Sequence, residues 1–462
     1  MRMNGGGTVL SPANFLSFLR NKRYLLTIVV GIVYVLLFII FFPFINNRSD
    51  YPGNVSPTSR QSARLFQAFG KAAALYVHFG AYRGGSDSFS VIGLGSKPTH
   101  VYSKPWFRCE WISNQDHVPN SYTKGKIFLP DWGYGRVYTV VVVNCTFQRN
   151  PNADNYGGKL FVYAFYSPSP LHYEKFFLLE EPPGSYDESR FRPPFKYDYL
   201  YCGSALFGSL NPRRVREWIS YHAFFFGPNS HFMLYDAGGI SADVKKVLDP
   251  WIELGRVTLQ DVRRQEDYDS WYYNQFLILN DCLHQNRYTA NWTFLFDVDE
   301  YIYLPDGSTL ESVLEELEDY SQFTIEQNPM SGKLCVDDPS RNYPTEWGFE
   351  KLNFREDITG LWRDRKYAVK ARNAYTVGVH MSEFLTGKTM HDTETKIRYY
   401  HYHGTTGYMG EVCRNIVPLP EKDNATWFEK APYVYDDNLT RFAPVIKQFE
   451  RQMIGSRQAF LD

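Results

Sequence analysis

The stretch WTFLFDVDEYIYL, residues 292–304, places three carboxylates inside an apolar and aromatic run. Burying Asp297, Asp299 and Glu300 costs free energy unless a cation or hydrogen-bond donors compensate. The residues before Asp297 predict a buried strand, and the period of two at its end would point Asp297 and Asp299 to the same side. Two converging carboxylates are typical of a site for Mg²⁺ or Mn²⁺ shared with a substrate phosphate. The alternative is a strand that ends in solvated acids.

Strands and helices alternate around this stretch. Residues 197–204 and 231–236 predict strands, which are separated by a helix that Asn211 can cap. Residues 268–283 predict a further helix that leads into the strand at 292–296. An open α/β sheet of this kind binds nucleotides at the carboxyl ends of its strands, where both aspartates fall. We expect nucleotide contacts from residues near these ends: Ser204, Arg213 and Asp236.

Histidines near the end of the chain are further candidates for metal ligands. His401 and His403 lie beside Gly404, and each of them could be a metal ligand or a structural residue. His380 stands alone, and a lone histidine is more often a hydrogen-bonded structural residue. The sequence contains no P-loop, no strand–helix GxGxxG, no HExxH and no GxSxG motif. It therefore disfavours phosphate binding by a P-loop or a Rossmann turn.

Length and composition indicate more than one domain. A chain of 462 residues exceeds one typical domain, and the proline-rich residues 181–195 separate two kinds of pattern. Residues 69–194 contain short β-prone runs between turn residues, which predicts a β-sandwich, whereas residues 195–462 carry the α/β alternation. The net charge of -1 offers no basic footprint for nucleic acid.

Cysteines and aromatic residues add predictions for the β-rich region. The six cysteines lack zinc-site spacing, so disulfides are expected in an oxidising compartment. Only the pair Cys109–Cys145 is favoured, because both lie in the β-rich region; the other four can pair in three ways or leave one pair reduced. Core packing is the commoner role of aromatic residues, but four of them could form a surface that stacks on sugars: Trp106, Trp111, Trp132 and Tyr134.

The N-terminal part contains a predicted transmembrane helix. Residues 24–45 carry no charge, and 22 residues at 1.5 Å each span roughly the 30 Å hydrocarbon core of a bilayer. Basic residues without any acid precede this segment, which predicts a cytosolic tail at residues 1–23 and a lumenal remainder. A cleaved signal peptide is the alternative. Residues 46–68 predict a flexible stem, and N-x-S/T sequons agree with a lumenal side: Asn144, Asn291, Asn424 and Asn438.

An ordered set of motifs resembles glycosyltransferase family 92. The motifs are LYCGSALFGSLNPRRVREWISYHAFFFGPNSHFMLYD at residues 200–236, FLFDVDEYIYLP at 294–305, KYAVKARNAYTVGVH at 366–380 and YYHYHGT at 399–405. The whole chain is similar to plant members of the family that synthesise β-1,4-galactan. The resemblance implies a GT-A type nucleotide-sugar domain at residues 195–462, preceded by a carbohydrate-binding module.

The same resemblance implies a reaction and a compartment. UDP-galactose would be the donor, Mn²⁺ the cofactor, and β-1,4-galactan of pectic rhamnogalacturonan I the acceptor, with inversion at the anomeric carbon. The protein would be a single-pass type II Golgi membrane protein, and the sequence leaves open whether it forms a homodimer. The family's Asp-x-Asp metal motif falls on Asp297 and Asp299. Family members tend to have His-Tyr-Arg where this chain has His-Tyr-His, which leaves open whether His401 or His403 reaches the metal.

Glycosyl transfer from UDP needs two kinds of side chain besides metal ligands. Basic groups can help to neutralise the leaving diphosphate, and the candidates for this role are Lys366, Lys370 and Arg372. Inversion also needs a carboxylate that accepts the proton of the acceptor hydroxyl on the face opposite UDP. Glu350, in Trp-Gly-Phe-Glu, is the first candidate, and Asp357 and Glu346 follow, although each could be a structural acid.

Two other functions fit part of the pattern. A membrane-tethered glycan-binding protein with an inactive transferase fold would use the β-rich region and would bind galactan without releasing UDP. The two aspartates together with the histidine-rich end argue against it. A glycosidase also needs paired carboxylates near aromatic residues, but it needs neither a metal for a diphosphate nor the basic residues.

Overall fold

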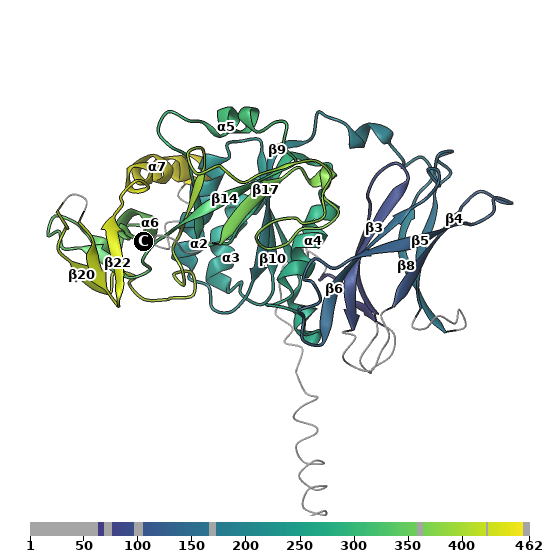
Figure 1. Ribbon diagram of the computed structural model, residues 1–462, viewed down its shortest axis with the longest axis horizontal. Coiled ribbons are helices and arrows are strands. Elements are labelled where there is room, and N and C mark those ends of the chain that lie inside the picture. Colours follow the sequence, from purple (N-terminus) through teal and green to yellow (C-terminus); the bar gives the residue numbers. More distant parts are fainter. Residues whose placement is uncertain are drawn as a thin grey trace, which may run out of the picture. The chain divides into compact units, whose positions relative to one another are not determined.

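A computed structural model describes most of the chain that follows residue 62 (Figure 1). The described residues are 63–68, 76–96, 105–165, 172–357, 364–421 and 424–455. The predicted cytosolic tail, the predicted transmembrane helix and most of the predicted stem lie outside them. Within these described residues, no helix is both long enough and apolar enough to cross a membrane.

Eight antiparallel strands form the β-rich region. They are β1 (Gln67–Ala68), β2 (Tyr76–Arg83), β3 (Ser88–Ser96), β4 (Trp106–Ser113), β5 (Ser121–Phe128), β6 (Tyr138–Thr146), β7 (Gly158–Phe165) and β8 (Tyr173–Glu181). The hydrogen-bonded order is β1-β2-β3-β6-β5-β4-β7-β8. β5 links two layers, because its first part up to Gly125 pairs with β4 whereas its last residues pair with β6.

The two layers of the β-rich region enclose a hydrophobic core. Buried side chains of β3 and β6 pack against those of β4 and β7. Trp111 belongs to this core, whereas Trp132 and Tyr134 are exposed. The predicted disulfide Cys109–Cys145 is confirmed, and it ties β4 to β6 across the core.

A nine-stranded mixed sheet confirms the predicted α/β alternation. Its strands are β9 (Tyr197–Leu206), β10 (Ser230–Asp236), β11 (Val257–Asp261), β12 (Ala290–Leu295), β13 (Glu300–Tyr303), β14 (Gln322–Pro329), β17 (Arg365–Val369), β18 (Thr389–Met390) and β19 (Arg398–His401). The order is β11-β10-β9-β12-β17-β14-β19-β13, and β18 also pairs with β14. The first four strands in this order are parallel, and β17 runs antiparallel to β12.

Helices cover both faces of this sheet (Figure 1). One face packs against α2 (Pro212–Phe225), α3 (Ala242–Glu253) and α5 (Leu310–Glu316), and α7 (Ala443–Ile454) packs against α2. The other face packs against α4 (Gln275–Gln285), which also contacts β2, β3 and β6. α4 is buried on almost all sides because it lies between two sheets. The β-rich region and the α/β region therefore share a core, and the disulfide Cys202–Cys282 ties β9 to α4.

Two helix starts test the sequence predictions. Asn211 caps α2 as predicted, because its side chain accepts a hydrogen bond from the N–H of Arg213. The helix predicted from residue 268 begins only at Gln275. Three residues before it, Tyr272, Tyr273 and Asn274, have left-handed backbone conformations, which a right-handed helix cannot contain.

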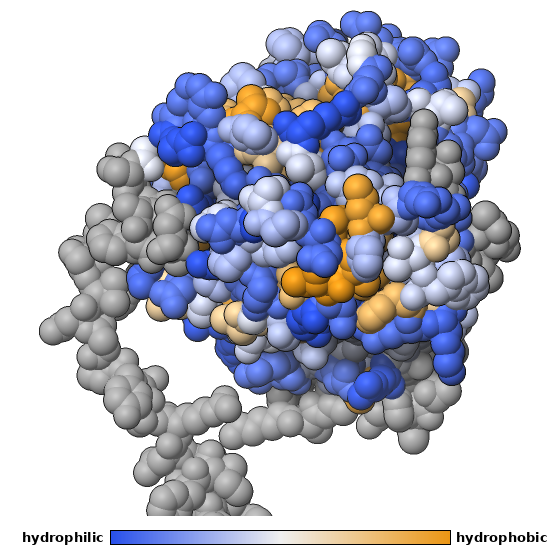
Figure 2. All heavy atoms as spheres, turned by 90° about the vertical axis from the view of Figure 1, so that its left-hand side faces the viewer, coloured by the Kyte–Doolittle hydropathy of each residue, from blue (hydrophilic) through white to orange (hydrophobic). Residues whose placement is uncertain are grey.

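Small sheets complete the C-terminal part. β15 (Leu334–Val336) pairs with β20 (Asn415–Val417), while β16 (Phe354–Glu356), β21 (Thr426–Phe428) and β22 (Ala431–Tyr435) form a three-stranded sheet beside the short helix α6 (Gly348–Lys351). The third disulfide, Cys335–Cys413, lies here, so all six cysteines are paired. Figure 2 faces this part and shows hydrophobic side chains gathered among hydrophilic ones. Ile416 and Leu419 are among its exposed apolar residues.

Candidate active site

The acidic stretch forms a turn between two strands. β12 ends at Leu295, and β13 begins at Glu300. The alternation predicted for Asp297 and Asp299 is therefore wrong, because neither residue is in a strand. The turn nevertheless places both carboxylates on the wall of one cavity, where each has its own partners.

This cavity has a volume of about 380 Å³ and lies at the carboxyl ends of β9 and β12. That end of a parallel sheet is where α/β folds bind nucleotides. Three segments besides the acidic turn form its walls: the loop after β9, the residues just before and at the start of α4, and the turn after β19. The lining residues are Ala205, Leu206, Phe207, Gly208, Ser209, Leu210, Tyr272, Gln275, Asp297, Val298, Asp299, His401, His403, Thr406 and Gly407.

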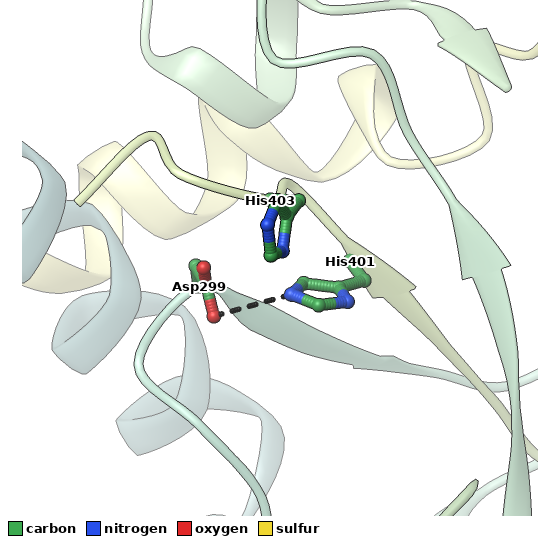
Figure 3. Close-up of side chains that lie close together, drawn as sticks. All are labelled: Asp299, His401 and His403. Atoms are coloured by element: carbon green, nitrogen blue, oxygen red, sulfur yellow. Dashed lines mark ion pairs between the residues drawn. The ribbon is translucent and has the colours of Figure 1, made fainter. Parts of the chain in front are cut away.

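Asp299, His401 and His403 converge on one side of the cavity (Figure 3). Each offers one ligand atom, and these atoms lie within 4.8 Å of one another. Nε2 of His401 lies 3.6 Å from Oδ1 of Asp299. The backbone N–H of Tyr402, between the two histidines, donates a 2.9 Å hydrogen bond to the carbonyl oxygen of Asp299. The backbone thus fixes the acidic turn against the histidine segment, and the three side chains could hold one divalent cation.

Asp297 has a different partner, a buried lysine on β17. Nζ of Lys366 lies 2.7 Å from Oδ2 of Asp297 and 3.6 Å from Oε1 of Glu300. Glu300 also accepts a 2.7 Å hydrogen bond from the backbone N–H of Asp297. Burial raises the pKa of Glu300 to about 7, although Lys366 opposes the shift. Burial acts to lower the pKa of Lys366, but the carboxylates of Asp297 and Glu300 outweigh it and raise that pKa.

The sequence leaves the role of Glu300 unassigned. Its position beside Asp297 and the ammonium of Lys366 gives it a structural role. Its side chain closes the acidic turn and shares the charge of Lys366. Lys366 was expected at the diphosphate because it lies in a basic stretch, and the structure places its ammonium beside the cavity through Asp297. Of the two aspartates, only Asp299 belongs to the cluster with the histidines.

Two residues predicted to contact the nucleotide, Arg213 and Asp236, are not among the lining residues of this cavity. Asp236 ends β10, where it accepts hydrogen bonds from the N–H groups of Gly238 and Ile240 at 2.8 and 3.3 Å. Arg213 is an exposed residue in the first turn of α2. Ser204 lies within β9, next to Ala205, which lines the cavity.

Lys370 and Arg372 lie near the amino ends of the parallel strands, at the other end from the first cavity. Because β17 runs antiparallel to β12, Lys366 at its start is near the carboxyl end of β12, and residues past its end are near the amino end. There the two basic residues line a second cavity of about 610 Å³ together with Asn291. The guanidinium of Arg372 donates a 3.0 Å hydrogen bond to the carbonyl oxygen of Asn291. The expectation that all three basic residues act together at one site is therefore not met.

The candidate catalytic carboxylates also lie outside the lining of the first cavity. Glu350 is in α6, where it accepts a 3.0 Å hydrogen bond from the backbone N–H of Trp347 and pairs with Lys447. Glu346 pairs with Arg341. Asp357 follows β16 and lies 4.0 Å from Arg355. The structure places these acids in ion pairs, so a role as proton acceptor stays a prediction.

Some cavity residues were not found from the sequence. Phe207, Tyr272 and Gln275 line the cavity, and the amide of Gln275 donates a 3.3 Å hydrogen bond to Oδ1 of Asp297. Phe207 follows a strand of the α/β sheet, so its position after that strand could have indicated it. Tyr272 carried no such signal, because residues 268–283 were expected to be helical.

Comparison with curated proteins finds close relatives. Galactan beta-1,4-galactosyltransferase GALS1 of Arabidopsis thaliana is 60% identical over 401 residues, which cover 87% of this chain and 80% of GALS1. GALS2 of the same species, also named a galactan beta-1,4-galactosyltransferase, is 51% identical over 405 residues, which cover 85% of this chain and 77% of GALS2.

Solved structures of glycosyltransferases are more distant. The apo bifunctional glycosyltransferase WbbM is 9% identical with a TM-score of 0.19, over 34% of this chain and 27% of WbbM. The galactosyltransferase LgtC, in complex with donor and acceptor sugar analogues, is 13% identical with a TM-score of 0.21, over 38% of this chain and 58% of LgtC. These TM-scores are too low to support a conclusion.

The family model named glycosyltransferase family 92 matches residues 197–441, more than half of the chain. The matched region contains β9, the acidic turn, Lys366 and both histidines of the cluster. Together with the identity to the Arabidopsis relatives, this match shows that the chain belongs to glycosyltransferase family 92.

Proposed function

We propose that this protein is an inverting galactosyltransferase that transfers galactose from UDP-galactose to β-1,4-galactan of pectic rhamnogalacturonan I. The observation that carries the proposal is the convergence of Asp299, His401 and His403 in a cavity at the carboxyl ends of the parallel strands. Relatives named galactan beta-1,4-galactosyltransferases, at 60% and 51% identity, support the donor sugar and the acceptor. A GT-A type domain would account for the mixed sheet.

The donor atoms of the cluster suit a divalent transition-metal ion, a class that includes Mn²⁺. One carboxylate oxygen and two imidazole nitrogens form a mixed set, whereas Mg²⁺ and Ca²⁺ favour oxygen ligands alone. Ligand atoms within 4.8 Å of one another can share one ion, and all three residues line the cavity. Asp299, His401 and His403 would hold the ion, which when bound would neutralise charge on the leaving diphosphate.

The remaining side chains of the site form ion pairs and hydrogen bonds that fix the acidic turn. Lys366 keeps its ammonium beside Asp297 and Glu300, where it offsets carboxylate charge near the place where diphosphate charge would develop. Asp297 orients that ammonium and accepts a hydrogen bond from Gln275. Glu300 keeps the turn closed through the N–H of Asp297. A preorganised arrangement of this kind needs little reorganisation when the glycosidic bond breaks.

The proposal places the enzyme in the Golgi lumen, as a type II membrane protein with residues 24–45 as its anchor. The pairing of all six cysteines supports an oxidising compartment of this kind. The β-rich region would act as a carbohydrate-binding module for galactan, beside the transferase region with which it shares a core.

The test is galactose transfer by the purified full chain in detergent, with UDP-galactose, Mn²⁺ and a β-1,4-galacto-oligosaccharide. We expect chain extension with β-linkage, loss of activity with a chelator, and recovery when Mn²⁺ is added back. A matched pair of variants, Asp299→Asn and the exposed Asp243→Asn, separates loss of the cluster from loss of any carboxylate. Binding of the oligosaccharide without any extension, under every metal tried, would instead favour an inactive glycan-binding protein.

A further inference from the structure

Three consecutive aromatic residues before α4 are exposed, and the middle one lines the carboxyl-end cavity. Trp271, Tyr272 and Tyr273 are 48%, 58% and 49% exposed, and Tyr272 lines the cavity itself. Exposing this much aromatic surface in one segment is costly in water, and such clusters mark binding sites. The lining of the cavity combines the polar ligands of the histidine cluster with the aromatic rings of Phe207 and Tyr272.

The backbone of this segment is held in an unusual shape. Tyr272, Tyr273 and Asn274 have φ angles of 44°, 54° and 57°, which residues with side chains rarely adopt in succession. The buried amide of Asn274 stabilises the shape by donating hydrogen bonds to the carbonyl oxygen and the side chain of Gln265 and to the carbonyl oxygen of Tyr268. Strained backbone that the surrounding structure enforces is typical of functional sites. Here the strained segment carries exposed aromatic side chains, one of which lines the cavity.

Ring contacts fix one side of the segment to the cavity wall. Tyr273 stacks on Phe207, with ring centroids 3.6 Å apart and planes at 15°. Tyr272 meets Phe207 edge-on at 5.7 Å. Because Phe207 also lines the cavity, the aromatic side of the cavity is a packed group of rings and not three independent side chains.

The exposed rings continue onto the β-rich region. Trp132 and Tyr134, in the loop between β5 and β6, are 52% and 65% exposed. Trp132 lies 6.2 Å from the ring of Phe276 in α4, and its Nε1–H donates a 2.7 Å hydrogen bond to Glu383. The backbone N–H of Tyr138 donates to the carbonyl oxygen of Asp269, so the loop that carries Trp132 lies beside the segment before α4. We name Trp271, Tyr272, Tyr273, Trp132 and Tyr134 the aromatic strip.

We propose that the acceptor end of a β-1,4-linked galactan chain lies along the aromatic strip, with Tyr272 nearest the reacting end and Trp132 and Tyr134 under sugars further back. This inference rests on the proposed function for the identity of the polymer. The axial O4 of galactose leaves one face of the ring with only C–H groups, and that face stacks on aromatic rings. A nucleotide base is compact and could use one ring near the cavity, whereas a strip that extends over two regions of the chain suits an extended polymer.

The test compares acceptors of two lengths, a disaccharide and an octasaccharide of β-1,4-linked galactose, in transfer assays with the full chain. Tyr272→Ala should raise the acceptor KM about tenfold for both lengths, and Tyr272→Phe should restore it because the ring remains. Trp132→Ala with Tyr134→Ala should raise KM only for the octasaccharide. Trp427→Ala, which removes a 73% exposed ring on β21, is the matched control and should change neither value.

Donor kinetics and direct binding distinguish the outcomes. The KM for UDP-galactose should stay within about twofold of wild type in every strip variant. A rise in the donor KM of Tyr272→Ala, with the acceptor KM unchanged, would mean that the ring stacks on the nucleotide and would overturn the proposal. Octasaccharide binding is also measured by calorimetry without UDP-galactose. If wild type binds the oligosaccharide but transfers no galactose, and the strip variants do not bind it, the proposed function is wrong. The proposal that the polymer binds to the aromatic strip would then still hold. Equal octasaccharide binding by wild type and all variants would overturn the proposal that the acceptor lies along the aromatic strip.

Discussion

Two cavities lie at opposite ends of the parallel strands, and the larger of the two is not the one lined by Asp299, His401 and His403. The amino-end cavity, lined by Lys370 and Arg372, has a volume of about 610 Å³, and the carboxyl-end cavity, lined by Asp299 and the two histidines, about 380 Å³. Several polar groups at the amino end bond to one another or to backbone: Asp198 accepts from the side chains of Asn229 and Asn291, and Lys370 and Arg372 donate to carbonyl oxygens. At the carboxyl end, ligand atoms from separate segments converge on one place. Strand direction, and not cavity size, therefore marks the site.

The largest effect should come from the carboxyl end. Asp299→Asn keeps the shape of the side chain but removes its charge from the cluster with His401 and His403. We expect kcat to fall about 1000-fold, which corresponds to roughly 4 kcal/mol of lost transition-state stabilisation. Single-turnover transfer from UDP-galactose at saturating Mn²⁺ measures this. A fall of less than about tenfold would mean that the cluster is not the metal site, and the contrast between the two ends would collapse.

The buried lysine should affect stability as well as transfer. Lys366→Met leaves the carboxylates of Asp297 and Glu300 without their ammonium in a largely buried place. Removing one partner of a buried ion pair costs about 3 kcal/mol of unfolding free energy, at the lower end of the usual range because Asp297 is partly exposed. Denaturant unfolding of the full chain in detergent measures the loss. Lys366→Arg is the control, because it retains the charge. Equal stability of Lys366→Met and wild type would contradict the role given to the network.

The sequence predicted which helices and strands surround the site better than it predicted the direction in which each strand runs in the sheet. The cap at Asn211 and the pair Cys109–Cys145 follow from local rules, because a capping side chain acts within one turn and both cysteines lie in one β-rich region. The separation of Lys366 from Lys370 could not be predicted, because it depends on β17 running antiparallel to β12, and residue spacing carries no strand direction.

The segment before α4 escaped prediction for a related reason. Aromatic residues at helical spacing predicted a helix from residue 268, whereas the observed left-handed residues are held by the amide of Asn274 reaching back to Gln265 and Tyr268. A contact within the folded loop outweighs the local preference of Tyr272 and Tyr273. The metal cluster was predicted as a set of candidates, but only the pairing of β13 with β19 brings Glu300 and His401 opposite each other.

A buried histidine near the amino end should make stability depend on pH without affecting the chemistry. His284 is at the end of α4, with its Nε2 3.0 Å from the carbonyl oxygen of Tyr375 and with Arg287 beside it. Burial, with a further contribution from Arg287, lowers the pKa of His284 to about 3. The unfolded chain therefore binds a proton near pH 6.5 that the folded chain does not, so stability is retained above that pH and falls as pH decreases towards 3.

The expected slope for His284 is about 1.4 kcal/mol per pH unit within that window. His284→Gln should flatten the dependence of the unfolding free energy on pH by this amount, whereas the same change at the exposed His172 should leave it unaltered. Chemical denaturation at several pH values between 4 and 8 measures both, with each value compared to the wild type. If the two variants have the same slope as wild type, His284 is not held neutral in the folded chain.

The smallest effect on transfer should come from the basic residues at the amino end. Lys370→Ala and Arg372→Ala change groups that lie past the end of β17, across the sheet from the cluster. We expect kcat and both KM values to stay within about twofold of wild type, while Arg372→Ala loses roughly 1 kcal/mol of stability because the carbonyl oxygen of Asn291 loses its donor. Lys366→Ala in the same assay should lose transfer. The variants at residues 366, 370 and 372 therefore compare the carboxyl end of the parallel strands directly with the amino end. A tenfold fall in kcat for Lys370→Ala in a stably folded protein would mean that the larger cavity takes part in the reaction, and strand direction alone would then no longer separate the two ends.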